Sequence, residues 1–271
     1  MPVLAQRVLS ALAALAIFFA SFYFGGYLGL SILATVIISI GVIEFGLLGN
    51  NIWAEYKNVI YTFCSISIGL HILHVALGKS LPIAHIFGPG LVAYFFVSLW
   101  VTRMKTNNRS ILKVIGFYTL GFIYAVLLPS FAVRLMLEES FDRLILLLII
   151  VFAGDTFAYF GGRFMGKRPL ASHLSPKKTL EGAMFGLIGS ILLALIVNLQ
   201  LKLPIENFKL VLFSVATGLA AQTGDLFESL IKRVAGKKDS GYILPGHGGV
   251  LDRLDGVYFA APIFYILVTH F

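Results

Sequence analysis

Residues able to do chemistry are concentrated near the C-terminal end of this 271-residue chain. Helical residues three, four and seven apart share one face. This spacing predicts one polar helix face made of Asp225, Glu228, Ser229 and Lys232. Asp252 and Asp255, three apart, predict a second acidic face at the positive end of a following helix. Between the two helices, the glycine-rich stretch 245–249 lets backbone amides approach an anion closely.

Two further polar segments precede this region. The first begins with Asp155, inside an otherwise apolar run, and ends in glycines and basic residues. The second predicts a helix that is capped by Ser175 and has Pro176 in its first turn. Lys177 and Lys178 would then lie at a helix N-terminus, which is a good phosphate site. The other interpretation of these two lysines is a basic loop that anchors the chain to anionic lipid.

These residue types suit a metal and a polyphosphate. Mg²⁺ prefers carboxylate and other hard oxygen ligands, keeps some of its waters and is shared with substrate phosphates. Lysines and arginines around such a metal suit a polyphosphate. The combination therefore predicts a nucleotide site. The opposing interpretation is a set of salt bridges between two helices, but five glycines between those helices make a poor rigid clamp.

The elements that position these residues must be membrane helices. The chain is 58% hydrophobic and 13% charged, whereas soluble domains carry about 25% charged residues. This composition excludes a secreted disulfide scaffold, a disordered regulator and a typical cytosolic enzyme. A single cysteine, Cys64, excludes an intramolecular disulfide and a thiolate zinc site. Nine runs approach the about 20 apolar residues that cross a bilayer, near 4–21, 26–48, 59–77, 83–101, 113–130, 142–161, 180–200, 208–231 and 253–270.

We therefore predict an all-α integral membrane protein of about nine transmembrane helices, with no separate soluble domain. Sixteen of the 21 Lys and Arg residues fall on the N-terminal side of this topology and five on the other. The positive-inside rule then places the N-terminus in the cytoplasm and the C-terminus outside. Residues 1–140 would form about five spans for packing and lipid contact, and 141–271 would carry the chemistry. The polar segments all face the cytoplasm, so the nucleotide would be handled beside a lipid.

The first half has few polar residues within its spans. An ionisable group inside a membrane helix is costly and is a candidate functional residue, and Glu44 is such a group. It would either shape a polar cavity or form a pair between helices. His71 and His74 are interpreted as interhelical hydrogen-bonding residues, because nothing nearby supplies further metal ligands. Gly182, Gly186 and Gly189 form a small-residue stripe that predicts close helix packing.

A long motif fills the 27 residues from 229 to 255. Its fixed positions read Ser229-x-Ile231-Lys232-Arg233-x4-Lys238-Asp239-x-Gly241-x2-Leu244-Pro245-x-His247-Gly248-Gly249-Val250-x-Asp252-Arg253-Leu254-Asp255. This motif resembles the signature of the phosphatidate cytidylyltransferase (CDP-diacylglycerol synthase) family at every fixed position. The 155–167 and 175–182 segments resemble the family's other cytoplasmic motifs, in the expected order. The first half fits only in hydropathy and in Glu44, and Gly256 replaces an expected serine.

The resemblance implies a nucleotidyltransferase of phospholipid biosynthesis. It would convert CTP and phosphatidic acid to CDP-diacylglycerol and pyrophosphate, with Mg²⁺, at the cytoplasmic face of the inner (plasma) membrane. Asp225 and Asp252 would hold the metal, with Glu228 or Asp255 as further ligands and room for a second cation such as K⁺. The catalytic residues would be Asp225, Asp252, Lys232 and His247, the last contacting pyrophosphate or bracing the loop. Substrate-binding positions would be Asp155, Lys177, Lys178, Glu181, Ser229, Arg233, Lys238, Asp239, Gly248, Gly249 and Arg253.

Other classes of function are less well supported. A transporter would line a pathway through the whole bilayer, whereas the polar residues here crowd at one side. The motif of the CDP-alcohol phosphotransferases begins with Asp-Gly, as Asp255-Gly256 does here. The later positions of that motif and its second pair of aspartates are missing from this sequence. A cytidylyltransferase for another lipid phosphate shares the same headgroup chemistry. The net charge of +8 is sorted by membrane side and does not indicate nucleic acid. A homodimer is implied by the family resemblance alone.

Overall fold

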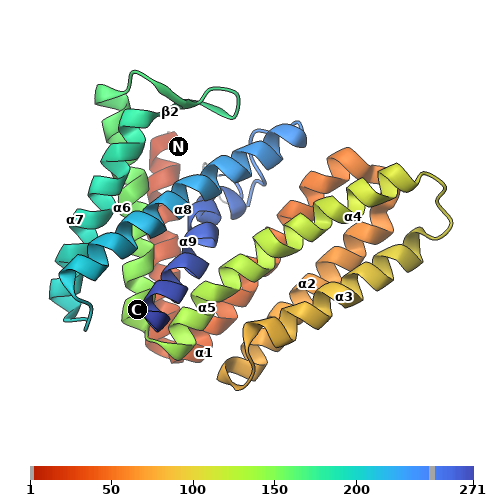
Figure 1. The fold of residues 1–271 in the computed structure, drawn as a ribbon, viewed down its shortest axis with the longest axis horizontal. Helices are drawn as coiled ribbons and strands as arrows, with labels where there is room; N and C mark the ends of the chain where they lie inside the picture. The colour runs from red at the N-terminus through yellow and green to blue at the C-terminus, as the bar shows by residue number, and fades with distance from the viewer. Residues whose placement is uncertain (1–2, 244–247) are drawn as a thin grey trace. The chain divides into compact units, whose positions relative to one another are not determined.

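The computed structural model describes residues 3–243 and 248–271, and these are almost entirely helical (Figure 1). A small two-stranded sheet is an addition to the predicted all-α class. The helices are α1 (Val3–Trp53), α2 (Lys57–Leu77), α3 (Ile83–Thr102), α4 (Asn108–Phe122), α5 (Leu128–Glu138), α6 (Phe141–Met165), α7 (Leu180–Leu201), α8 (Asn207–Val234) and α9 (Leu251–His270). The shorter elements are η1 (Ala54–Tyr56), η2 (Gly78–Ser80), the π-turn η3 (Ile123–Leu127), β1 (Pro169–Ala171) and β2 (Ser175–Thr179).

The helices confirm an all-α membrane protein. Six segments of the described chain are long and apolar enough to cross a bilayer. They are Leu9–Leu77, Ile83–Thr102, Asn108–Glu138, Phe141–Met165, Leu180–Leu201 and Asn207–Val234. The first segment overlaps three of the runs predicted as spans. Gly26, with φ 56° and ψ −142°, breaks α1 between the first two of them, because a left-handed φ suits only glycine without strain. The count of nine and the orientation stay predictions.

The described chain forms two compact units. The first unit comprises Met1–Val133 and Val234–Arg253, and the second comprises Arg134–Arg233 and Leu254–Phe271, with the masked positions left aside. The chain passes from one unit to the other three times, and the third passage falls within α9, after Arg253. The motif of residues 229–255 therefore contributes residues to both units. The predicted division at residue 140 stays a prediction.

Aromatic packing builds the core of the first unit, where α2 lies against α1 and α3 (Figure 1). Phe45 of α1 stacks on Phe117 of α4 with 4.9 Å between ring centroids. Tyr118 of α4 donates a hydrogen bond of 3.3 Å to the carbonyl of Gly46. His71 Nδ1 lies 3.1 Å from Ser130 Oγ of α5, which confirms the interhelical hydrogen bond predicted for this histidine.

Close helix packing organises the second unit, where α6 and α7 lie side by side (Figure 1). A Cβ added at Gly182 would lie 2.8 Å from the carbonyl oxygen of Ala158, and one at Gly186 would lie 2.9 Å from that of Gly154. The stripe predicted from Gly182, Gly186 and Gly189 is therefore confirmed as a packing surface. Only glycines at these positions allow the two backbones to approach so closely.

A hairpin joins α6 to α7, where the sequence predicts the start of a helix. Strands β1 and β2 are antiparallel, and Ala171 pairs with Ser175. The prediction of a helix capped by Ser175 is wrong: α7 begins at Leu180, and its N-cap is Thr179, whose hydroxyl accepts the Gly182 N–H at 3.1 Å. Pro176 has no backbone donor and is tolerated in a two-stranded sheet, where every strand is an edge.

Candidate active site

Six charged side chains of the second unit interact with one another. They come from α6, β2, α8 and α9, and we name them the acid–lysine cluster: Asp155, Lys178, Asp225, Glu228, Lys232 and Asp255. All six were predicted from the sequence as site residues. The structure therefore brings together positions that lie up to a hundred residues apart in the chain.

Lys178 is the centre of the acid–lysine cluster. Its ammonium forms an ion pair with Asp225, and it interacts electrostatically with Asp255, Asp155 and Glu228. Burial lowers the pKa of Lys178, and the nearby carboxylates oppose that shift. Lys178 lies on strand β2 and not at a helix N-terminus, so the predicted phosphate site at a capped helix is wrong. The strand instead presents a half-buried ammonium group to four carboxylates.

Glu228 and Lys232 form the buried part of the acid–lysine cluster. Lys232 Nζ lies 2.6 Å from Glu228 Oε2, and the glutamate side chain is 1% exposed. Their separation of four residues places them on one face of α8, as the spacing predicts. Burying a glutamate this deeply is tolerated only because a charged donor meets it.

Asp255 of α9 faces the same part of α8. It accepts the Gly256 N–H at 2.8 Å, and its carboxyl group interacts with that of Glu228. Gly224 makes this possible, because a Cβ at this position would overlap the carbonyl oxygen of Asp255. A glycine in α8 thus sets the close approach of α9 and brings the two carboxyl groups together.

The acid–lysine cluster has the donor chemistry of a magnesium site that is completed by a substrate. It holds four carboxylates and two ammonium groups, an excess of negative charge that suits a divalent cation. Within the part of the chain that the structure describes, no group of three or more His, Cys, Asp or Glu side chains is arranged as a metal site. Mg²⁺ does not need such a cage, because it is usually bound through one or two carboxylates and substrate phosphates.

Asp252 lies in the first unit and accepts hydrogen bonds from Ser240 and Gly249. Its Oδ2 accepts three hydrogen bonds, from Ser240 N at 2.8 Å, Ser240 Oγ at 2.9 Å and Gly249 N at 2.8 Å. The sequence predicts loop amides that approach an external anion, yet these described amides donate to a carboxylate of the chain itself. Ser240 was not among the predicted site residues, and only its place between Asp239 and Gly241, typical of a turn, pointed to it.

The remaining predicted site residues are placed individually. Glu181 Oε2 accepts the backbone N–H groups of Lys167 and Arg168 at 3.0 and 3.1 Å, and so braces the turn after α6. Ser229 is half-buried on α8. His247 lies outside the described residues. The exposed members of the predicted set are Lys177, Arg233, Lys238, Asp239 and Arg253.

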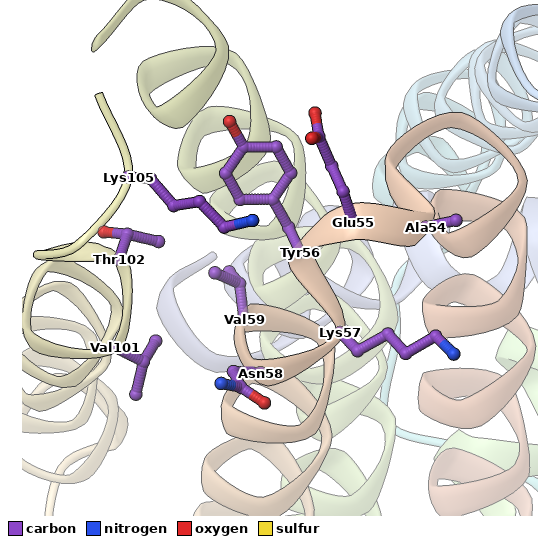
Figure 2. A pocket seen from close by; sticks show the side chains of 9 residues that line it. All are labelled: Ala54, Glu55, Tyr56, Lys57, Asn58, Val59, Val101, Thr102 and Lys105. Atoms are coloured by element: carbon purple, nitrogen blue, oxygen red, sulfur yellow. The ribbon is translucent and has the colours of Figure 1, made fainter. Parts of the chain in front are cut away.

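A separate cavity of about 210 Å³ lies in the first unit. Figure 2 shows that it is bordered by η1, the start of α2 and the end of α3, and that the Lys105 ammonium points toward Tyr56. The ammonium lies 5.4 Å from the Tyr56 ring centroid. Glu55 supplies the one carboxylate among the nine lining residues. The acid–lysine cluster is therefore the better candidate for metal-assisted chemistry.

Comparisons with known proteins identify the family to which the chain is similar. A sequence model described as the cytidylyltransferase family matches residues 5–271. A phosphatidate cytidylyltransferase of Bacillus subtilis (strain 168) is 36% identical over 183 residues, which are 66% of this chain and 68% of that protein. One from Rickettsia typhi is 42% identical over 183 residues, covering 65% of this chain and 77% of the relative. A chloroplastic phosphatidate cytidylyltransferase of Arabidopsis thaliana is 45% identical over 118 residues, 44% of this chain and 29% of its own.

Proposed function

This chain belongs to the cytidylyltransferase family, and we propose that it is the enzyme that converts CTP and phosphatidate to CDP-diacylglycerol and pyrophosphate. The observation that supports this most strongly is the acid–lysine cluster. It gathers carboxylates and lysines from α6, β2, α8 and α9, and there a water-soluble nucleotide would meet a lipid whose acyl chains stay in the bilayer.

The reaction is a displacement at phosphorus. An oxygen of the lipid phosphate forms a bond to the α-phosphorus of CTP, and the bond between that phosphorus and the β-phosphate bridging oxygen breaks. The electron pair leaves with pyrophosphate. A phosphomonoester has a second pKa of about 6 and is largely dianionic at neutral pH, so the nucleophile needs no strong general base. What it needs is relief of charge repulsion and an in-line position.

Lys178 and Lys232 provide this relief in our proposal. Each ammonium lies among carboxylates that hold it in place, Lys178 beside Asp225 and Lys232 beside Glu228. A fixed cation stabilises charge that develops on a phosphate without reorganising during the reaction. Lys177, Arg233, Lys238 and Arg253 are exposed basic side chains and would bind phosphate. His247 would contact pyrophosphate or brace the loop.

The carboxylates that Mg²⁺ would share with the phosphates are Asp225, Glu228 and Asp255. When bound, Mg²⁺ neutralises phosphate charge and orients the phosphates for in-line attack. Asp252 stays a predicted ligand through its carboxylate, although its Oδ2 already accepts three hydrogen bonds from the loop. The excess of acidic groups leaves room for a second cation such as K⁺.

We further propose how the enzyme lies in the membrane. Nine transmembrane helices, a cytoplasmic N-terminus and an external C-terminus would place the acid–lysine cluster at the cytoplasmic face of the plasma membrane. The distribution of Lys and Arg supports this orientation. A lateral opening between helices would admit the phosphatidate headgroup, and the family resemblance supports a homodimer.

The test uses purified full-length protein in detergent micelles with phosphatidate, Mg²⁺ and CTP labelled in its α-phosphate. Label should pass to the organic phase only when phosphatidate and Mg²⁺ are both present, and Asp225→Asn should reduce it at least a hundredfold. A lysine outside the cluster, Lys209, provides the control variant Lys209→Met. Transfer of label to another lipid phosphate but not to phosphatidate would show that the acceptor is that other lipid. No label on any lipid phosphate, from a folded protein, would refute the enzyme assignment.

A further inference from the structure

Glu44 is a buried carboxylate whose role the reaction above does not explain. It lies in α1, within the apolar segment Leu9–Leu77, and is 2% exposed. An ionisable side chain at such a place costs several kcal/mol unless specific partners compensate it. Its partners therefore indicate what it does.

Those partners are at the beginning of α9, about 200 residues later in the chain. Glu44 Oε1 accepts the Val250 N–H at 3.0 Å, and Oε2 accepts the Leu251 N–H at 2.9 Å. The first N–H groups of a helix have no acceptor inside that helix. Glu44 supplies the missing acceptors from α1 and also places a negative charge at the positive end of α9.

Two described glycines that precede α9, Gly241 and Gly249, leave room for this carboxylate. A Cβ at Gly249 would lie 2.5 Å from Glu44 Oε2 and 2.6 Å from Oε1, and one at Gly241 would overlap Oε1. Both glycines are fixed positions of the motif described above. Their small size is required here because the Glu44 carboxylate occupies the space that a side chain would fill.

Ser240 connects Glu44 to Asp252. Its hydroxyl lies 3.2 Å from Glu44 Oε2 and 2.9 Å from Asp252 Oδ2, and its N–H also donates to Asp252. We propose that Glu44 is a positioning residue, which through Ser240 and the amides of Val250 and Leu251 holds Gly249 and Asp252 in the arrangement that binds the nucleotide. This proposal rests on the proposed function, because its kinetic part requires the CTP reaction.

The effect of substituting Glu44 follows from its two carboxylate oxygens, each of which accepts a backbone N–H. Glu44→Gln keeps the volume but removes the charge and turns one acceptor into an NH₂ donor that faces a backbone N–H. Glu44→Asp keeps both oxygens but withdraws them by one methylene. Glu55→Gln is the matched control, because Glu55 is an exposed carboxylate near the end of α1.

Two measurements on full-length protein in micelles test the proposal. Hydrogen–deuterium exchange should become at least tenfold faster at Val250 and Leu251 in Glu44→Gln. In the assay with labelled CTP, the same variant should raise the KM for CTP about tenfold and change the KM for phosphatidate less than twofold. Glu44→Asp should recover part of both effects, and Glu55→Gln should change neither.

The exchange result and the kinetic result test separate parts of the proposal. Unchanged exchange at Val250 and Leu251 in a folded Glu44→Gln variant would show that Glu44 does not hold these two amides, whatever the enzyme assay shows. Faster exchange with unchanged KM for CTP would overturn the positioning role. If Glu44→Gln does not fold, Ser240→Ala replaces it, with faster exchange at Gly249 and an about threefold rise in the KM for CTP expected. A wild-type protein without transferase activity would refute the proposed function, and the exchange result would still decide whether Glu44 holds α9.

Discussion

Lys178 offers the sharpest test of the acid–lysine cluster. The change is Lys178→Met, which keeps an unbranched side chain of similar length and removes the ammonium. Lys178 is paired with Asp225 and interacts with Asp155, Asp255 and Glu228. Its removal leaves those carboxylates less neutralised, and they would then repel the phosphates that the site must bind.

The expected loss of activity in Lys178→Met follows from the distance between the charges and from their exposure to solvent. Two unit charges about 4 Å apart interact by about 4 kcal/mol at an effective dielectric constant of about 20. The Lys178 side chain is 28% exposed and that of Asp225 is 32% exposed. Solvent screening of such partly exposed groups reduces the value, and we expect a loss of about 2 to 3 kcal/mol, or about 30- to 150-fold in kcat/KM.

The assay is transfer of label from CTP to the organic phase at saturating Mg²⁺, with thermal unfolding in micelles as a check on folding. Lys177→Met is the comparison, because adjacent strand residues point to opposite faces and Lys177 is exposed. We expect a loss no larger than about fivefold for this variant. Equal losses for the two variants would refute the special role of Lys178, since net positive charge on the hairpin would then be all that matters.

Three further predictions concern the elements around the cluster. Lys232→Met leaves the buried Glu228 carboxylate without its ammonium, so thermal or denaturant unfolding in micelles should show a destabilisation of about 3 kcal/mol; an unchanged unfolding midpoint would mean that the pair is not buried. Gly224→Ala forces α8 away from α9 and should lower the free energy of unfolding by about 1 to 3 kcal/mol and lower activity. Gly116→Ala is the control, because the added Cβ meets no atoms within 4 Å and should change neither. Thr179→Ala removes the N-cap of α7 and should destabilise by about 1 kcal/mol, measured by thermal unfolding; Thr179→Ser should retain most of this stability, and equal losses would argue against the cap.

The class of protein could be predicted from the amino-acid sequence. Hydropathy predicted apolar helices, and six segments of the described chain meet the criteria for crossing a membrane. Helical spacing predicted that Glu228 and Lys232 share a face, and they are paired. The motif ending at Asp255 indicated the family, which the match over residues 5–271 confirms. These features are readable because hydropathy, helical periodicity and motif spacing are properties of neighbouring residues.

The partners that Lys178 and Glu44 find on distant elements could not be predicted from the sequence. The hairpin at 169–179 depends on pairing between two short strands, so Ser175 and Pro176 alone suggested a helix start. Glu44 was recognisable as a costly buried charge, but its partners, Val250 and Leu251, lie more than 200 residues away. The physical reason is the same in both cases. A residue's type states that a donor or counter-charge is needed, whereas packing between distant elements determines which group supplies it.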